Sequence, residues 1–195
     1  LPWMVLGIAP WLYMNKTTLD ASRSVYQQVG LVSKMKFPVS VLPSIKIYGN
    51  LYSYWTMMAF GVFLMFTNGI YVSISWIQFI YYFICMIALM FAVGIFNSTV
   101  SVLIRDWHIT LQSILRMLFY MSGVLFNFTT SNFPAFLVRL LELNPFYYVL
   151  NGMRESLLNK GWIWQQPNVN LTIVFWLFVL IVMIVGSYLH NKFRS

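Results

Sequence analysis

The feature that most constrains this chain is a long run without a charged side chain. From Ile47 to Ile104 no Asp, Glu, Lys or Arg occurs, and the run suffices for two membrane crossings joined by TNGIYVSIS. A spanning helix needs roughly 20 mostly apolar residues. Further uncharged runs cover 117–138 and 161–191, and the chain opens on the apolar stretch LPWMVLGIAPWLYMN. The bilayer is therefore the natural solvent of this sequence.

The amino-acid composition and the residue periodicity both indicate membrane-spanning helices. The chain is 60% hydrophobic and 8% charged, whereas soluble domains are about 45–50% apolar and about 25% charged. Only helices and closed barrels satisfy their backbone groups in lipid. Barrel strands alternate apolar and polar residues, and FIYYFICMIALMFAVGIF does not alternate. We therefore expect an all-α integral membrane protein.

The apolar runs predict the positions of the spans. We place five of them at about 1–18, 47–67, 76–103, 109–128 and 171–190. The chain begins with Leu inside an apolar segment, so we expect a sixth span before residue 1. All of 1–195 is then a single transmembrane domain.

Lysine and arginine predict the orientation of these spans, because cytoplasmic loops carry an excess of both. Alternating crossings put nine cations on one side: Lys16, Arg23, Lys34, Lys36, Lys46, Arg105, Arg116, Lys192 and Arg194. The other side has three: Arg139, Arg154 and Lys160. The first side should be cytoplasmic, and it contains the C-terminus. The cations are spread over several turns rather than one basic face, which argues against nucleic-acid binding.

The segment 135–160 contains two short amphipathic stretches on the predicted outer side. In NPFYYVLNGMRESLLNKG, Asn144 can cap a helix and Pro145 suits its first position. Lys160 and Gly161 supply a stop signal. We expect two short helices that lie in the outer interface or dip into it. An ordinary outer loop packed on the spans is the alternative.

Motifs for chemistry are scarce. The sequence contains no GxxxxGK[ST], GxSxG or HExxH, and its single Cys85 belongs to no Cys/His cluster that would indicate a metal. The best catalytic candidate is RDWH, in which Asp106 and His108 could form an acid/base pair. The simpler interpretation is a polar corner, with Asp106 near a helix N-terminus where its charge is favoured.

A possible substrate path is marked by a cation and aromatic side chains. Arg116 lies one or two turns inside the span predicted at 109–128, where a charge faces protein or water, or snorkels to the headgroups. Aromatic residues make up 19% of the chain. Their faces can contact sugar rings without a fixed hydrogen-bond pattern, although simple packing is the alternative. The candidate path residues are Tyr52, Trp55, Arg116, Phe119 and Tyr120.

Three stretches resemble the type-2 ABC exporter permeases. LPWMVLGIAPWLYMN followed by GLVSKMKFPVSVLPSIK is similar to the second span and first cytoplasmic loop of that family. STVSVLIRDWHITLQSILRMLFYMSGVLF is similar to its junction of spans four and five, where an arginine–aspartate pair, here Arg105 and Asp106, is typical. LNPFYYVLNGMRESLL resembles its outer helix. The resemblance is closest to the polysaccharide and teichoic acid branch, and within it to the teichoic acid permeases.

The resemblance implies six spans, five of them visible here, without the N-terminal amphipathic helix and first span. It implies that 31–46 is the coupling loop that docks on a separate ATPase, through Ser33, Lys34, Met35, Lys36, Phe37 and Pro38. The residue types agree, because Pro38 and Pro43 stiffen the chain and the lysines can meet acidic groups. Taken alone, the residues equally allow lysines that hold the loop at anionic headgroups.

The resemblance also implies the partners and the activity. Two copies form a conduit with two ABC ATPase subunits, which bind the ATP and Mg, and this chain carries no cofactor or catalytic site. The outer helices shape the exit through Asn144, Pro145, Tyr147, Tyr148 and Arg154. We expect a permease of the bacterial cell membrane that exports a lipid-linked glycopolymer, wall teichoic acid in the first place. The alternatives are a capsule or O-antigen polysaccharide as cargo, and a membrane-embedded glycan transferase using Asp106 and His108.

Overall fold

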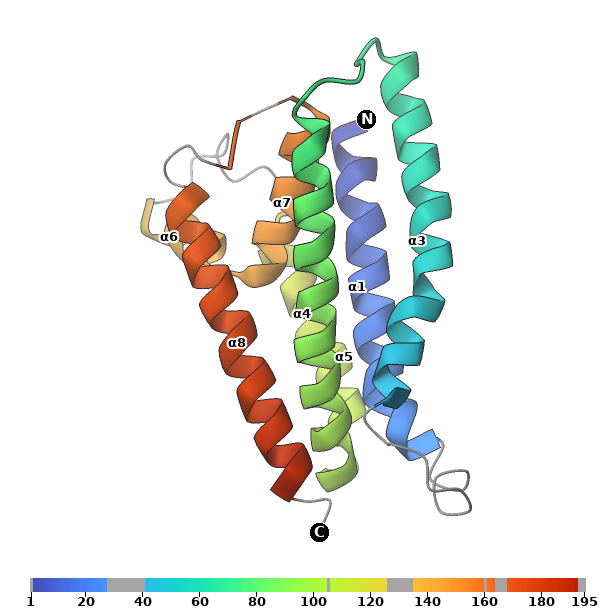
Figure 1. Ribbon diagram of the computed structural model, residues 1–195, viewed down its shortest axis with the longest axis vertical. Helices are drawn as coiled ribbons and strands as arrows, with labels where there is room; N and C mark the ends of the chain where they lie inside the picture. Colours follow the sequence, from blue (N-terminus) through green and yellow to red (C-terminus); the bar gives the residue numbers. More distant parts are fainter. Residues whose placement is uncertain are drawn as a thin grey trace.

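Long helices lying side by side form the body of the molecule (Figure 1). The computed structural model describes residues 2–27, 41–104, 106–125, 135–159, 161–163 and 168–192, and the regular elements of this part are all α-helices. The predicted all-α fold class is confirmed there. The long helices are α1 (Pro2–Gln27), α3 (Val41–Thr67), α4 (Trp76–Leu103) and α8 (Asn168–Lys192). The shorter ones are α5 (Trp107–Met121), α6 (Ala135–Glu142) and α7 (Pro145–Leu157).

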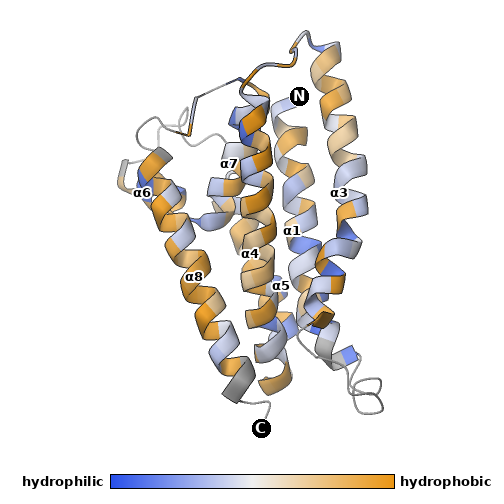
Figure 2. Cartoon of the chain, viewed as in Figure 1, coloured by the Kyte–Doolittle hydropathy of each residue, from blue (hydrophilic) through white to orange (hydrophobic). Residues whose placement is uncertain are grey.

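Helix α4 occupies the centre and packs against α1 on one side and α8 on the other (Figure 1). Two helices, Trp76–Leu103 and Val169–Leu189, are long and apolar enough to cross a membrane. Hydrophobic residues run along both, whereas hydrophilic ones gather toward one end of α1 and α3 (Figure 2). Helices α1 and α3 have 26 and 27 residues, a length of about 40 Å at the α-helical rise. The number of spans stays a prediction.

Helix α5 is shorter than the sequence indicated. A span was expected over 109–128, but the helix ends at Met121 after 15 residues, or about 22 Å. The N–H of Ser122 still bonds the Leu118 carbonyl, and Gly123 then adopts a φ of 62°. Glycine takes this left-handed conformation without steric cost, so it ends helices readily. The sequence did not predict this helix end, because the residues around Gly123 are hydrophobic and continue the apolar run.

Helix α7 is an interior element. Ten of its 13 residues are buried. The Asn144 side chain accepts a hydrogen bond from the Phe146 N–H at 3.0 Å, and Pro145 occupies the first turn, so the cap predicted from the sequence is confirmed. Gly152 faces the ring of Tyr82 on α4, where a Cβ would overlap that ring. The absence of a side chain at Gly152 therefore allows α7 to approach α4 closely.

Neutral hydrogen bonds join α4, α7 and α8. The indole N–H of Trp176 donates to the Tyr81 hydroxyl at 2.9 Å, and the hydroxyls of Tyr148 and Thr172 lie 2.7 Å apart. The rings of Tyr148 and Phe175 stack with centroids 4.9 Å apart. The Tyr and Trp polar atoms thus have partners although their rings are packed, as buried residues of these types require.

We predict that Gly152→Ala destabilises the protein, because the added methyl group must displace the Tyr82 ring. Overpacking of this kind costs about 1–3 kcal/mol. The matched control is Gly49→Ala on α3, where a Cβ would meet nothing within 4 Å and should leave stability unchanged or raise it by up to about 1 kcal/mol. Unfolding midpoints in mild detergent compare the two variants. Equal midpoints would contradict close packing of α7 on α4.

Candidate functional site

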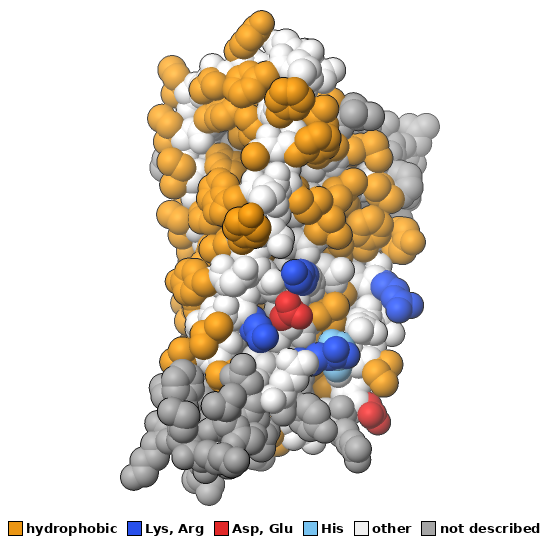
Figure 3. All heavy atoms as spheres, turned by 90° about the vertical axis from the view of Figure 1, so that its right-hand side faces the viewer, with side chains coloured by type: hydrophobic (Ala, Val, Ile, Leu, Met, Phe, Trp, Pro, Cys, Tyr) orange, Lys and Arg blue, Asp and Glu red, His pale blue; other side chains and the backbone are white. Residues whose placement is uncertain are grey.

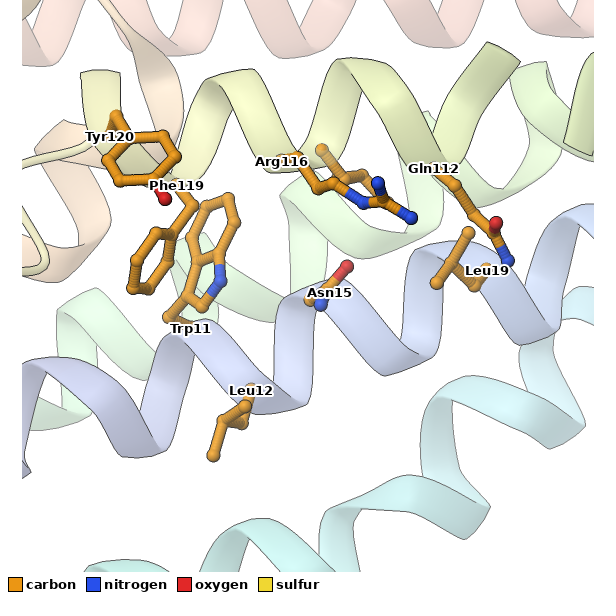
Figure 4. Close-up of a pocket in the computed structure, with 9 residues that line it drawn as sticks. Trp11, Leu12, Asn15, Leu19, Gln112, Arg116, Phe119 and Tyr120 are labelled. Carbon is orange, nitrogen blue, oxygen red and sulfur yellow. The ribbon is translucent and has the colours of Figure 1, made fainter. Parts of the chain in front are cut away.

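A groove of about 470 Å³ lies between α1 and α5 (Figure 4). We call it the α1–α5 groove. It is lined by Trp11, Leu12, Asn15 and Leu19 of α1 and by Gln112, Leu115, Arg116, Phe119 and Tyr120 of α5. Among the residues of α5, only Leu111 and Leu115 are buried, so the helix packs against the bundle through one narrow edge. The space beside that edge remains open.

The spacing of the lining residues explains why they meet. Trp11, Asn15 and Leu19 recur every four residues on α1, and residues four apart lie on one helical face. On α5, Gln112 and Arg116 repeat the same interval, and Phe119 and Tyr120 continue it by another turn. Two stripes of equal spacing therefore face one another across the groove.

The groove has an aromatic end and a polar end. Figure 4 shows Trp11, Phe119 and Tyr120 at one end, Gln112 at the other, and Asn15 with Arg116 between them. The Trp11 and Phe119 rings lie with centroids 5.7 Å apart, and Trp11 also contacts Phe146 of α7 at 6.0 Å. A guanidinium can bind phosphate or carboxylate. Amides can bond hydroxyl groups, and aromatic faces offer apolar contact. The arrangement therefore suits an amphiphile that combines an anion with sugar rings.

The structure brings together three of the five predicted path residues. Arg116, Phe119 and Tyr120 line the groove, whereas Tyr52 and Trp55 project from the exposed face of α3. Tyr52 is 79% exposed, and the Trp55 ring packs on Phe83 of α4 at 5.3 Å. The face of α3 that meets the bundle contains Tyr54 and Met58. Tyr52 points away from that face, whereas Trp55 lies at its edge against α4. Tyr52 and Trp55 therefore do not line the α1–α5 groove, and their role in a substrate path stays a prediction.

Sequence reasoning missed the α1 half of the groove. Trp11 and Asn15 were read as parts of an apolar span, and Gln112 was not singled out. The four-residue spacing from Trp11 to Leu19, matched by Gln112 and Arg116, was the available signal. That spacing alone could not say which two helices would face each other.

A buried arginine holds the aromatic end together. Arg154 of α7 is 2% exposed, and its guanidinium donates to the carbonyls of Gly123 at 2.7 Å and Val124 at 2.5 Å, just beyond the end of α5. The same group lies 3.9 Å from the ring centroid of Trp3 on α1. A Cβ at Gly7 would overlap it. Arg154 therefore fixes both walls of the groove relative to α7.

The Arg154 charge persists in this buried position. Burial lowers the pKa of the guanidinium to about 10, and the nearby Tyr147 acts in the opposite sense. A pKa of that size still leaves the group protonated at neutral pH. Its bonds to the two carbonyls are therefore charge-assisted, which makes them stronger than neutral ones.

The other residues expected to shape an exit lie around α7. Asn144 and Pro145 begin the helix, and Tyr147 and Tyr148 are buried in its first turns. Tyr148 bonds toward α8 through Thr172, as described above. These residues are thus tied into the bundle, and a role at an exit stays a prediction.

A second cavity of about 380 Å³ lies beyond the polar end of the groove, lined by Ser22, Arg23, Gln27, Ser101, Asp106, His108 and Ile109. Asp106 occupies the N-cap position of α5 without a side-chain capping bond. The ring nitrogens of His108 face Ser22 and Gln112. That geometry gives the predicted Asp106–His108 acid/base pair no support. Arg105 and the coupling residues Ser33 to Pro38 lie outside the described part of the chain.

On one face of the molecule, charged side chains gather at one level. On the face shown in Figure 3, Lys, Arg, Asp and His side chains lie below a broad hydrophobic band. Among the described residues of α1, α3 and α5, the cations are Lys16, Arg23, Lys46 and Arg116. Asp20 of α1 accepts a hydrogen bond from Asn50 of α3 at 2.9 Å within this region. An apolar band bounded by a charged level is typical of a helical membrane protein.

The fold and the groove define a helical membrane protein, and comparison with known proteins narrows the class. No family model matches the chain. The O-antigen export system permease protein RfbA of Klebsiella pneumoniae is 23% identical over 194 residues, which cover 98% of this chain and 72% of that protein. The RfbA permease of Myxococcus xanthus is 21% identical over 145 residues, or 73% of this chain and 55% of that protein.

These similarities support the resemblance to ABC exporter permeases at the level of the class. Both relatives are named as export permeases, which favours a transport subunit over an enzyme. Neither relative is named for teichoic acid, so the narrower match to the teichoic acid branch has no support from them.

We predict that Arg154→Met lowers the free energy of unfolding by about 2–4 kcal/mol, because two carbonyls lose charge-assisted donors in a buried site. Arg154→Lys should lie between wild type and Arg154→Met, since lysine keeps the charge without the planar fork. The control is Arg139→Met on the exposed surface of α6, with an expected change within about 0.5 kcal/mol. Denaturant unfolding in mild detergent measures all three. Similar losses at Arg154 and Arg139 would contradict the anchoring role.

Proposed function

We propose that this chain is the membrane subunit of an ATP-driven exporter that moves a lipid-linked glycopolymer across the bacterial cell membrane. The observation that carries the proposal is the similarity to the Klebsiella export permease over 98% of the chain. The α1–α5 groove supports it, because Arg116 and the aromatic residues suit a cargo that combines phosphate with sugars.

In the proposed assembly, two copies of the chain surround a conduit and two ABC ATPase subunits bind at the cytoplasmic side. The ATPases hold the ATP and Mg, and their closure pushes the coupling loop 31–46. Helix α1 precedes this loop in the sequence, and α3 begins within it at Val41, so its displacement acts on α1, one wall of the groove. The C-terminus lies on the same cytoplasmic side, and α6 and α7 lie toward the exit.

Two cargoes are compatible with this scheme. An O-antigen or capsule polysaccharide is favoured by the names of both relatives. Wall teichoic acid is favoured by the sequence stretches VSKMKFP and ILRMLFY. Depletion of the protein distinguishes the two, because the polymer that it exports should accumulate on its carrier lipid at the cytoplasmic face. A phosphate-rich polyol would identify teichoic acid, and a sugar polymer without it would identify a polysaccharide.

The exporter assignment is tested by purification of the full-length protein from its own membranes in mild detergent. We expect an ABC ATPase to co-purify with the native protein. It should be lost when Lys34, Met35, Lys36 and Phe37 are changed to alanine, with Lys16→Ala as a control outside the loop. If no ATPase co-purifies with the native protein, the exporter assignment loses its basis.

We predict that Arg116→Gln reduces export tenfold or more. A hydrogen bond to a charged group contributes about 1.5–3 kcal/mol, and each 1.4 kcal/mol corresponds to a factor of about ten. Lys16→Gln is the matched control, since Lys16 is an exposed cation of α1 that does not line the groove. Export is measured as surface polymer per unit of protein in the membrane. Equal losses in both variants would indicate a general effect of charge.

A further inference from the structure

His108 connects the two walls of the groove at its polar end. It lies in the first turn of α5, just before the span predicted at 109–128. Its Nδ1 is 3.2 Å from the Ser22 hydroxyl of α1, and its Nε2 is 3.1 Å from the Gln112 amide nitrogen one turn along α5. Gln112 also lines the groove. One imidazole therefore contacts the opposite wall and a groove residue together.

The hydrogen-bond partners define which ring nitrogen carries the proton. The Ser22 hydroxyl donates to the Leu19 carbonyl at 2.7 Å, so its oxygen can only accept from His108. Nδ1 must then be the protonated nitrogen. An amide N–H2 group donates and does not accept, so Nε2 must be the unprotonated acceptor for Gln112. The arrangement is consistent only with a neutral imidazole that carries its proton on Nδ1.

The surroundings favour this neutral form. Burial lowers the pKa of His108 below its ordinary value, Arg23 of α1 acts in the same direction, and Asp20 of α1 opposes them. Asp106, in the turn before α5, lines the same cavity, and α4 contributes the uncharged hydroxyl of Ser101. The lowered pKa disfavours the imidazolium and so agrees with the neutral form that the hydrogen bonds require.

The neutral imidazole has a direct consequence for the groove. One N–H of the Gln112 amide is engaged by His108, which fixes the orientation of the amide and leaves its oxygen and its second N–H for other partners. A protonated Nε2 would be a donor, and Gln112 would have to turn its oxygen toward the ring and its nitrogen toward the ligand. The state of His108 thus decides which end of the Gln112 amide is held at the ring and which end can turn to a ligand.

We propose that His108 is a positioning residue of the α1–α5 groove, which orients the Gln112 amide so that its oxygen accepts a hydrogen bond from a sugar hydroxyl of a lipid-linked glycan. The role in transport rests on the proposed function. The orientation of the amide and the affinity for a glycolipid do not require export, so they can be measured separately.

The first experiment measures which ring nitrogen of His108 carries the proton. The chain has two histidines, so His190→Gln leaves His108 as its single imidazole. In histidine-¹⁵N-labelled protein at pH 7.5, long-range ¹H–¹⁵N correlation should show a protonated Nδ1 and an unprotonated Nε2. Ser22→Ala should abolish this preference. Ser24→Ala should keep it, because Ser24 bonds its own helix at Ala21. A proton on Nε2, or an imidazolium at pH 7.5, would overturn the proposal.

The second arm tests whether His108 acts through Gln112. The probe is decyl glucosyl phosphate, a diester whose charge does not change between pH 5 and 8, and binding is followed by equilibrium dialysis. We expect His108→Phe and Gln112→Ala each to weaken binding about three- to tenfold. The double variant should lose no more than Gln112→Ala alone, because the two residues act as one unit. Additive losses would overturn the positioning role.

The pH dependence separates positioning from a loss of structure. Wild-type affinity for the probe should fall over the pH range in which the ¹⁵N spectra show that His108 gains its second proton, whereas His108→Gln, which cannot be protonated, should show a flat profile. Unfolding midpoints confirm that the variants are folded. If wild type does not bind the probe at pH 7.5, the ligand class is wrong and the inference fails. An ATPase that co-purifies would still support the exporter assignment, so the two failures are distinguishable.

Discussion

The contacts of the buried Arg154 guanidinium hold α1, α7 and the segment just beyond α5 together. One side chain of α7 binds the carbonyls beyond α5 and packs on Trp3 and Gly7 of α1. A cation is costly to bury without partners, and here carbonyl oxygens accept from Nη1 and Nη2 and an indole face covers the group. Because α5 buries only two of its own side chains, this junction largely determines where that helix ends relative to α1.

Polar contacts of unequal strength thus hold the two ends of the groove. At the aromatic end the buried, charged side chain of Arg154 makes two hydrogen bonds. At the polar end a single neutral bond joins Ser22 to His108. Hydrogen bonds to charged groups contribute roughly twice as much as neutral ones. Separation of α1 from α5 should therefore begin at the His108 end, where α1 leads into the proposed coupling loop.

The sequence predicted the helical class well, because uncharged runs and the lack of alternation depend only on solvent and backbone geometry. It also predicted the Asn144 cap, which is a local feature of α7. The end of α5 was misjudged because Gly123 sits in an apolar run whose hydrophobicity concealed the turn. The aromatic residues Tyr52 and Trp55 were grouped with Arg116, but they lie on α3 and do not line the groove. Helical spacing identifies a face, but tertiary packing alone decides what that face meets.

The hydrogen bonds that join α4, α7 and α8 have a consequence for how the molecule responds to its medium. They involve Tyr81, Tyr148, Thr172 and Trp176, all uncharged. Dissolved ions weaken attractions between charges, and they leave neutral bonds in a packed interior almost untouched. One side of the bundle should then keep its shape across ionic strengths and acidities that alter the side with Arg23, His108 and Arg116. The protein thus has one side held by uncharged hydrogen bonds and another side whose charged groups respond to salt and pH.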